Sequence, residues 1–318
     1  MKLGKLFENL IKSGIEEDPR GKEGIKRILK ERKKIYNELS DEDKKFYDIE
    51  SLSNPYYDSR LQYGDTDSEI RSIMAGIDCE APELLLADRL REKGKRIDFV
   101  LSHHPKRYFG FENELKIQID LLHDAGIPIN IAEGIFIPRI KELERALAPG
   151  NDTRSLDTAR LLDIPFGSTH TVADNHVHQF LKKKFEKNKP CKVKDVIDLL
   201  LEEPEYQDAK KKGNGLKIFA GDRERFAGEI YLYMTGGTSG PKEELEWLAK
   251  RSNIGTIVAM HITDERRKLA EQNHINVVIA GHMASDSLGM NLLLDKILRM
   301  DKKMEIIPVS GYFWHSRL

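Results

Sequence analysis

Short apolar runs alternate with longer amphipathic segments along most of this chain. From Ile70 onward, IRSIMAGID, RIDFVLS and IPINIAEG have the composition of buried strands, and the helical segments APELLLADRLREKG and ENELKIQIDLLHDAG lie between them. The pattern resumes downstream, with strand-like runs in PFGST, KIFAGD, EIYLYM, GTIVAM, INVVIA and EIIPVS. Strands that alternate with helices are typical of βαβ units, so the pattern predicts an α/β protein with mainly parallel sheets.

Two segments differ from this pattern. Residues 1–66 are rich in Lys and Glu and carry apolar residues such as Leu6, Leu10 and Ile11 at helical spacing. We therefore expect a helical N-terminal extension, followed by the turn-rich loop NPYYDSRLQYGD. Between Lys182 and Gly215 the chain is charged and lysine-rich, which indicates a boundary between lobes.

Composition indicates a soluble protein of two or three domains. The chain has 318 residues, 39% of them hydrophobic, and 52 Lys plus Arg balance 53 Asp plus Glu to leave a formal net charge of -1. This balance argues against a chain-wide attraction to nucleic acid or membranes. The N-terminus lacks the apolar run of a secretory signal, and Cys79 and Cys191 fit no paired spacing, so we expect a cytoplasmic protein with free thiols.

Histidines follow four of the predicted strands. Five of the ten histidines stand after apolar runs: His103, His104, His170, His261 and His282. Because ligands bind outside the carboxyl ends of the strands in an open α/β sheet, these imidazoles should gather at one edge. Pro105 ends the first of these strands, which frees its two adjacent imidazoles from the strand alternation and lets both face one site.

Two carboxylates have a spacing that suits the same site. Asp174 follows His170 by four residues and Asp286 follows His282 by four, so each pair can share one helical face. Imidazole and carboxylate ligands without thiolate suit Zn, Mn or Fe(II) in a catalytic site, and the set exceeds what one four-coordinate ion uses. The pattern therefore predicts two divalent ions, about 3.5–4 Å apart, bridged by a carboxylate or hydroxide. Asp78, which ends another strand-like run, is a candidate for orienting a ligand histidine.

Each of these residues also has a structural interpretation. A single histidine at a strand end is more often a capping or core residue than a ligand, and His170 and His261 can equally be groups that orient ligands or substrate. The remaining histidines have no patterned partner and are assigned no site: His123, His176, His178, His274 and His315.

Three motifs, in their order along the chain, resemble those of a known family. HHP after a strand, HTVAD before a helix and GHMASD at the start of a C-terminal helix resemble the motifs of the NGG-interacting-factor-three-like (Nif3-like) family of dinuclear metal proteins, commonly labelled GTP cyclohydrolase I type 2 homologues. The resemblance runs from about Ile70 to the C-terminus and places His170 near the metals. The metal ligands that it implies are His103, His104, Asp174, His282 and Asp286. Family members more often have Glu where Asp286 stands, and the segment between HHP and HTVAD is longer here than usual.

The resemblance also implies the overall organisation. The expected fold has two α/β lobes with mainly parallel or mixed sheets and the metal site between them, together with the helical extension at 1–66. The first lobe would span 67–185 and be completed by 270–318, and the second would span 186–269. Assembly into a ring-shaped homohexamer is implied as well.

The leading hypothesis for function is a metal-dependent hydrolase. Two divalent ions, Zn, Fe or Mn, would generate hydroxide at neutral pH, and His170 or His261 would be the catalytic residue that transfers a proton. The substrate would be a nucleotide or another phosphoester, and the family label adds a reaction of the GTP cyclohydrolase type. The alternatives are a non-catalytic, metal-stabilised binding or regulatory scaffold, and a ring that contacts nucleic acid, which the near-neutral charge disfavours.

Overall fold

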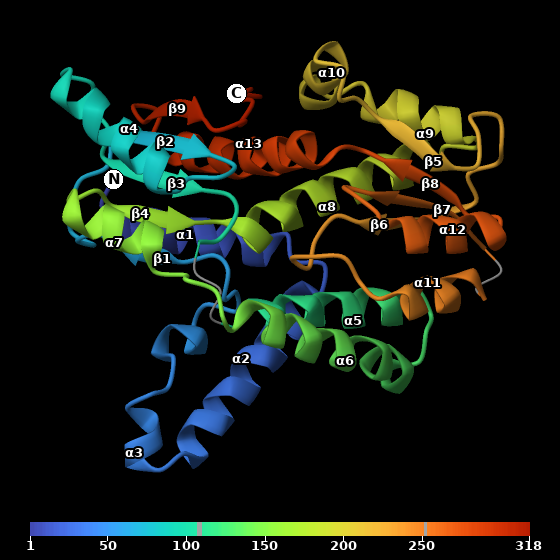
Figure 1. The fold of residues 1–318 in the computed structure, drawn as a ribbon, viewed down its shortest axis with the longest axis horizontal. Helices are drawn as coiled ribbons and strands as arrows, with labels where there is room; N and C mark the ends of the chain where they lie inside the picture. Colours follow the sequence, from blue (N-terminus) through green and yellow to red (C-terminus); the bar gives the residue numbers. More distant parts are fainter. Residues whose placement is uncertain (107–109, 251–252) are drawn as a thin grey trace.

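Two β-sheets form the framework of the protein. The computed structural model describes residues 1–106, 110–250 and 253–318. The five-stranded sheet contains, in spatial order, β1 (Leu61–Tyr63), β4 (Phe166–Ser168), β3 (Phe99–Ser102), β2 (Ser72–Gly76) and β9 (Glu305–Val309). The four-stranded sheet contains β5 (Lys217–Ala220), β8 (Asn276–Ile279), β7 (Ile254–Ala259) and β6 (Glu229–Tyr233). The two sheets lie at opposite ends of the molecule (Figure 1).

Parallel pairing prevails in both sheets. β2 lies between β3 and β9, with Ile73 opposite both Phe99 and Ile306, and β3 pairs in parallel with β4. In the second sheet, β7 pairs in parallel with β6 and β8, whereas β1 and β5 pair antiparallel at the sheet edges. Every residue of β2 and β3 is buried, which explains why these strands are continuous apolar runs. The predicted α/β class is confirmed, with two mixed sheets.

Two long helices join the sheets. α8 (His170–Asn188) follows β4 and α13 (His282–Met300) follows β8, and the two pack side by side between the sheets (Figure 1). At Gly289 of α13, a Cβ atom would lie 2.5 Å from the carbonyl oxygen of Ala173, so the close approach of the helices requires glycine there. Within the described ranges, no helix is both long and apolar enough to cross a membrane.

The N-terminal segment contributes to the core beneath the five-stranded sheet. The apolar stripe of α1 (Leu3–Glu16) is buried with residues of β2, β3, α8 and α13. α2 (Gly21–Glu38) and α3 (Asp41–Lys44) project from the molecule, and the 3₁₀ helix η1 (Ile49–Leu52) leads back toward β1 (Figure 1). Residues 1–66, expected as an extension, therefore supply both a core helix and an edge strand. On the far side of this sheet, α4 (Ala81–Glu92) and α7 (Arg154–Leu161) pack together.

Helices from several parts of the chain cover the four-stranded sheet. One face packs against the 3₁₀ helix η2 (Phe111–Leu115), α5 (Lys116–Asp124), α6 (Ile129–Leu147), α11 (Lys242–Ala249) and α12 (Asp264–Gln272). The other face packs against α8 and α9 (Val193–Leu200), with α10 (Pro204–Lys211) beside them. α5 and α6 fall in the range expected for the first lobe, and β8 falls in the range expected to complete it. The chain thus passes between the two lobes more often than the expected residue ranges allow.

The strand predicted in IPINIAEG is wrong. This run forms the first turns of α6, which begins directly after Pro128. The buried Ala132 and Phe136 are four residues apart, so they lie on one helical face, and Ile131 and Ile135 pack beside them. The β-branched composition suggested a strand, but the apolar spacing that continues through α6 is that of a helix.

Candidate metal centre

Histidines that follow four strands converge between the two sheets. β3 leads into His103 and His104, and β4 leads into His170, the first residue of α8. From the other sheet, β7 precedes His261, and β8 precedes His282, the first residue of α13. The ring centroids of His104 and His282 are 5.2 Å apart, and those of His103 and His170 are 4.9 Å apart. The imidazoles thus lie at the facing edges of two sheets, where a single edge was expected.

Adjacent imidazoles share the site because the chain turns after β3. The backbone N–H groups of His103 and His104 donate to the carbonyls of Gly76 and Ile77, at 2.8 and 2.9 Å, so the end of β2 still holds this segment. The two rings nevertheless lie 5.1 Å apart between centroids, and Nε2 of each is 3.5 Å from a carboxylate oxygen of Asp286.

Asp286 lies at the centre of the cluster. Its carboxylate is fully buried, with Oδ1 3.5 Å from Nε2 of His103 and Oδ2 3.5 Å from Nε2 of His104. Oδ2 is also 3.6 Å from Nε2 of His282. Asp174 lies beside it, with Oδ1 3.6 Å from Nε2 of His103 and Oδ2 3.8 Å from Nε2 of His170.

Several of these atoms are buried without a hydrogen bond. Among the described residues, both ring nitrogens of His103, Oδ1 of Asp174 and both carboxylate oxygens of Asp286 have no hydrogen-bond partner. Each such atom costs about 1–3 kcal/mol, and more if charged. Separations of 3.5–3.6 Å are too long for N–H···O hydrogen bonds but are close to the ~3.3 Å between two ligands of a tetrahedral ion with bonds of ~2.0 Å. The donor atoms present therefore fit a divalent cation.

Three sets of side chains place their ligand atoms within 4.8 Å of one another. The sets are His103–Asp174–Asp286, His104–His282–Asp286 and His103–His104–His170. Asp286 belongs to two of them and offers a different oxygen to the imidazoles of each. These sets support a metal-binding protein.

Burial and neighbouring charges perturb the titration of the ligands. Burial lowers the pKa of His103 to about 4 even though Asp286 is close, so the imidazole is neutral at pH 7, as a metal ligand must be. Burial, with the charges of Asp286 and Asp58, raises the pKa of Asp174 well above its ordinary value. A bound cation would offset the repulsion between these buried carboxylates.

Two further carboxylates contact Nδ1 of His104 and Nδ1 of His170, the ring nitrogens that face away from the cluster. Nδ1 of His104 lies 3.0 Å from Oδ1 of Asp78, which also accepts a hydrogen bond from Lys106 at 2.8 Å. The structure thus places Asp78 where the sequence suggested an orienting group. Nδ1 of His170 lies 2.9 Å from Oδ2 of Asp58. Sequence reasoning missed Asp58, because no spacing rule links residues 112 positions apart.

The other histidines lie at the rim of the cluster or away from it. His261 is exposed, with Nδ1 2.9 Å from the hydroxyl of Ser239 and its ring centroid 5.2 Å from that of His282. It belongs to none of the three ligand sets that the described residues form. The same is true of the five histidines to which the sequence assigned no site: His123, His176, His178, His274 and His315.

A pocket between the lobes opens onto the cluster. His170 and Asp174 line it from one side, and His261, His282 and the loop after β6 line it from the other. In this loop Gly236 and Gly237 have φ angles of 101° and 80°, which favour glycine. The pocket has a volume of about 30 Å³, enough for a water molecule, and the side chain of His282 is 39% exposed, so water reaches the cluster from here.

Comparisons with known proteins identify similar folds. No protein-family model and no curated protein matches the chain. Among solved structures, a NIF3 superfamily protein from Sphaerobacter thermophilus is 25% identical and has a TM-score of 0.68, over 80% of this chain and 91% of its own. Reduced HcgD from Methanocaldococcus jannaschii is more distant, with 16% identity and a TM-score of 0.49 over 87% of this chain and 96% of its own. A Bacillus cereus protein related to NIF3 has 10% identity and a TM-score of 0.42, over 91% and 97% of the two chains.

Proposed function

The chain is a Nif3-like protein, and from this premise we propose that it is a dinuclear metal-dependent hydrolase. The observation that carries the proposal is the spacing of buried atoms in His103, Asp174 and Asp286. These atoms have no hydrogen-bond partner within the described residues, yet they are separated by distances typical of ligands on one ion.

Two ions would divide the ligands without conflict. His103, Asp174 and Oδ1 of Asp286 would hold one ion, and His104, His282 and Oδ2 of Asp286 would hold the other. Asp286 would then bridge the pair, although family members more often have Glu at this position. Nitrogen and oxygen ligands favour Zn, Fe or Mn in both positions.

The residues around the pocket have suitable positions for hydrolysis. Divalent ions here would polarise a substrate oxygen and make water acidic enough to attack at neutral pH. Nε2 of His170 points toward the cluster and would accept a proton, and His261 at the rim is the second candidate for this transfer. We propose a nucleotide or another phosphoester as the substrate, with a GTP cyclohydrolase-like reaction as the specific case that the family resemblance adds.

A metal-stabilised scaffold is the second candidate function. The ligands come from both lobes, and His103, Asp174 and Asp286 are almost fully buried, as ligands of structural metals often are. The partly exposed His282, which also lines a second pocket of about 260 Å³ with Asn214 and Met283, favours access of a substrate instead.

Metal content and turnover, measured on the same samples, test the proposal. Protein purified without added metal and then reconstituted with Zn²⁺, Mn²⁺ or Fe²⁺ should bind about two equivalents per chain and hydrolyse GTP or bis(p-nitrophenyl) phosphate. Asp286→Ala should lose both properties. The control Asp198→Asn should keep both, because this side chain is 65% exposed and lies in no ligand set of the described residues.

Two outcomes would change the conclusion. Two bound equivalents without turnover of any nucleotide or phosphoester would favour the scaffold. Failure to take up any of the three metals would overturn both candidate functions. Native mass spectrometry of the same samples tests the proposed homohexamer.

A further inference from the structure

We propose that Asp58, from the N-terminal segment, is a positioning residue that sets the tautomer and the orientation of His170 at the metal centre. The inference rests on the proposed function only for the role of His170 in proton transfer at the metal centre. Its geometric part concerns the metal-free protein and is tested separately.

The contact between Asp58 and His170 determines where the imidazole carries its proton. The carboxylate of Asp58 is fully buried, and its Oδ2 lies 2.9 Å from Nδ1 of His170. An ionised carboxylate only accepts hydrogen bonds, so the proton of the neutral imidazole must lie on Nδ1. Nε2 is then left with a free lone pair on the side that faces the cluster, 3.8 Å from Oδ2 of Asp174.

Asp58 itself is held by donors from two neighbouring residues. The hydroxyl of Thr171 donates to Oδ2 at 2.7 Å, and the backbone N–H of Thr171 is 3.3 Å from both carboxylate oxygens. The hydroxyl of Ser59 donates to Oδ1 at 3.0 Å. Thr169, the N-cap residue of α8, makes no side-chain cap, so Asp58 takes this place at the helix N-terminus, where a negative charge is favoured.

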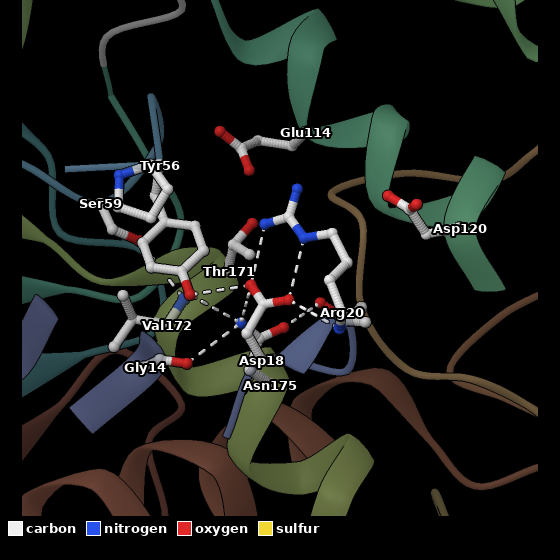
Figure 2. A network of polar contacts seen from close by, with 12 residues as sticks. Gly14, Asp18, Arg20, Tyr56, Ser59, Glu114, Asp120, Thr171, Val172 and Asn175 are labelled. Atoms are coloured by element: carbon white, nitrogen blue, oxygen red, sulfur yellow. Dashed lines mark hydrogen bonds and ion pairs between the residues drawn. The ribbon is translucent and has the colours of Figure 1, made fainter. Parts of the chain in front are cut away.

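The loop that carries Asp58 is anchored by the buried network of Figure 2. The hydroxyl of Tyr56 donates to Asp18 at 2.9 Å, and Arg20 donates to both carboxylate oxygens of Asp18 at 2.9 and 2.8 Å. The amide of Asn175, one residue beyond Asp174, lies 3.2 Å from both Asp18 and the Tyr56 hydroxyl. The N-terminal segment therefore forms hydrogen bonds with α8 at Thr171 and at Asn175, on both sides of Asp174.

His170 is restricted on its ring face as well. The ring of Phe111 stacks on it, with centroids 5.8 Å apart and an interplanar angle of 24°. Asp58 at the ring edge and Phe111 at the ring face leave one nitrogen, Nε2, directed to the centre.

Nitrogen-15 NMR of the histidine side chains in metal-free protein tests the proposal. The signals of His170, assigned by their loss in His170→Gln, should show the tautomer protonated on Nδ1. Asp58→Ala should shift them toward the other tautomer. The control Asp48→Ala removes the ion pair with Arg60 (2.7 Å) in the same segment and should leave the tautomer unchanged.

Zn²⁺ affinity, measured by competition with a chelator, gives the second readout. Because His170 lies beside the ligands and holds neither proposed ion, Asp58→Ala should bind Zn²⁺ within a few-fold of wild type, and a loss of about 10–100-fold would contradict a role confined to orienting His170. A wild-type His170 protonated on Nε2 would overturn the proposal, whether or not any variant folds. An unchanged tautomer in folded Asp58→Ala would do the same. If wild-type protein binds no metal, the proposed function fails while the tautomer assignment stands.

Discussion

Replacing Asp174 with Asn should stabilise the metal-free protein and remove its stabilisation by metal. The carboxylate of Asp174 is 4% exposed, and burial together with the charges of Asp286 and Asp58 raises its pKa well above the ordinary value of 3.8. At neutral pH the metal-free folded state must therefore bind a proton here or carry another charge beside two carboxylates. Asparagine keeps the shape of the side chain and removes that cost, but it also removes an anionic ligand.

The expected magnitude follows from linkage between protonation and folding. Each unit by which folding raises the pKa of an acid costs about 1.4 kcal/mol of stability once the pH exceeds the raised value. We therefore expect the metal-free variant to have a free energy of unfolding at least about 1 kcal/mol higher than the parent at pH 7. Because the penalty develops as pH rises from the ordinary pKa to the raised one, the difference should shrink on acidification toward pH 4. Metal at 100 times its dissociation constant stabilises the parent by about 2.7 kcal/mol, and most of this gain should disappear in the variant.

Urea denaturation of both proteins, with EDTA and with Zn²⁺, measures these quantities. Asp198→Asn, at an exposed position, should behave as the parent does under both conditions. A metal-free Asp174→Asn protein less stable than the parent would refute the argument, since the carboxylate would then make favourable contacts within the protein. A full stabilisation by Zn²⁺ in the variant would refute its place among the ligands.

Three further predictions concern pH, helix packing and ligand orientation. Burial lowers the pKa of His178 to about 4, so the folded protein loses stability through this group as pH falls from about 6.5 toward 4. In metal-free protein, His178→Gln should reduce the decrease in unfolding free energy between pH 7 and pH 5 by about 2 kcal/mol, measured by urea denaturation. Gly289→Ala should cost about 1–3 kcal/mol of unfolding free energy, because the new Cβ would meet a backbone carbonyl of α8. The control Gly134→Ala in α6 has open space around it and should stabilise by up to about 1 kcal/mol, so equal effects would contradict the packing argument. Asp78→Ala should weaken Zn²⁺ binding about 10–100-fold in chelator competition. Unchanged binding would show that the contact between Asp78 and His104 does not orient the His104 imidazole for metal binding.

Local patterns in the sequence determined most of the strands and the positions of the histidines. β2 and β3 could be predicted because a strand buried on both faces carries an apolar run, here 73–75 and 99–101. The ends of β3, β4, β7 and β8 could be predicted because each apolar run stops just before a histidine. Such features depend on a few consecutive residues, so they are visible without a structure.

Contacts between distant segments were decided only by the tertiary structure. The pairing of β1 with β4 places Asp58 beside His170, and no local signal marks that contact. The packing of α5 and α6 on the four-stranded sheet, and the helical state of IPINIAEG, depend on which apolar faces meet in the folded chain. The sequence could identify the side chains able to hold a metal, because their chemistry is local. Their meeting across two sheets follows from burial of apolar surface far from the site, and spacing along the chain does not record it.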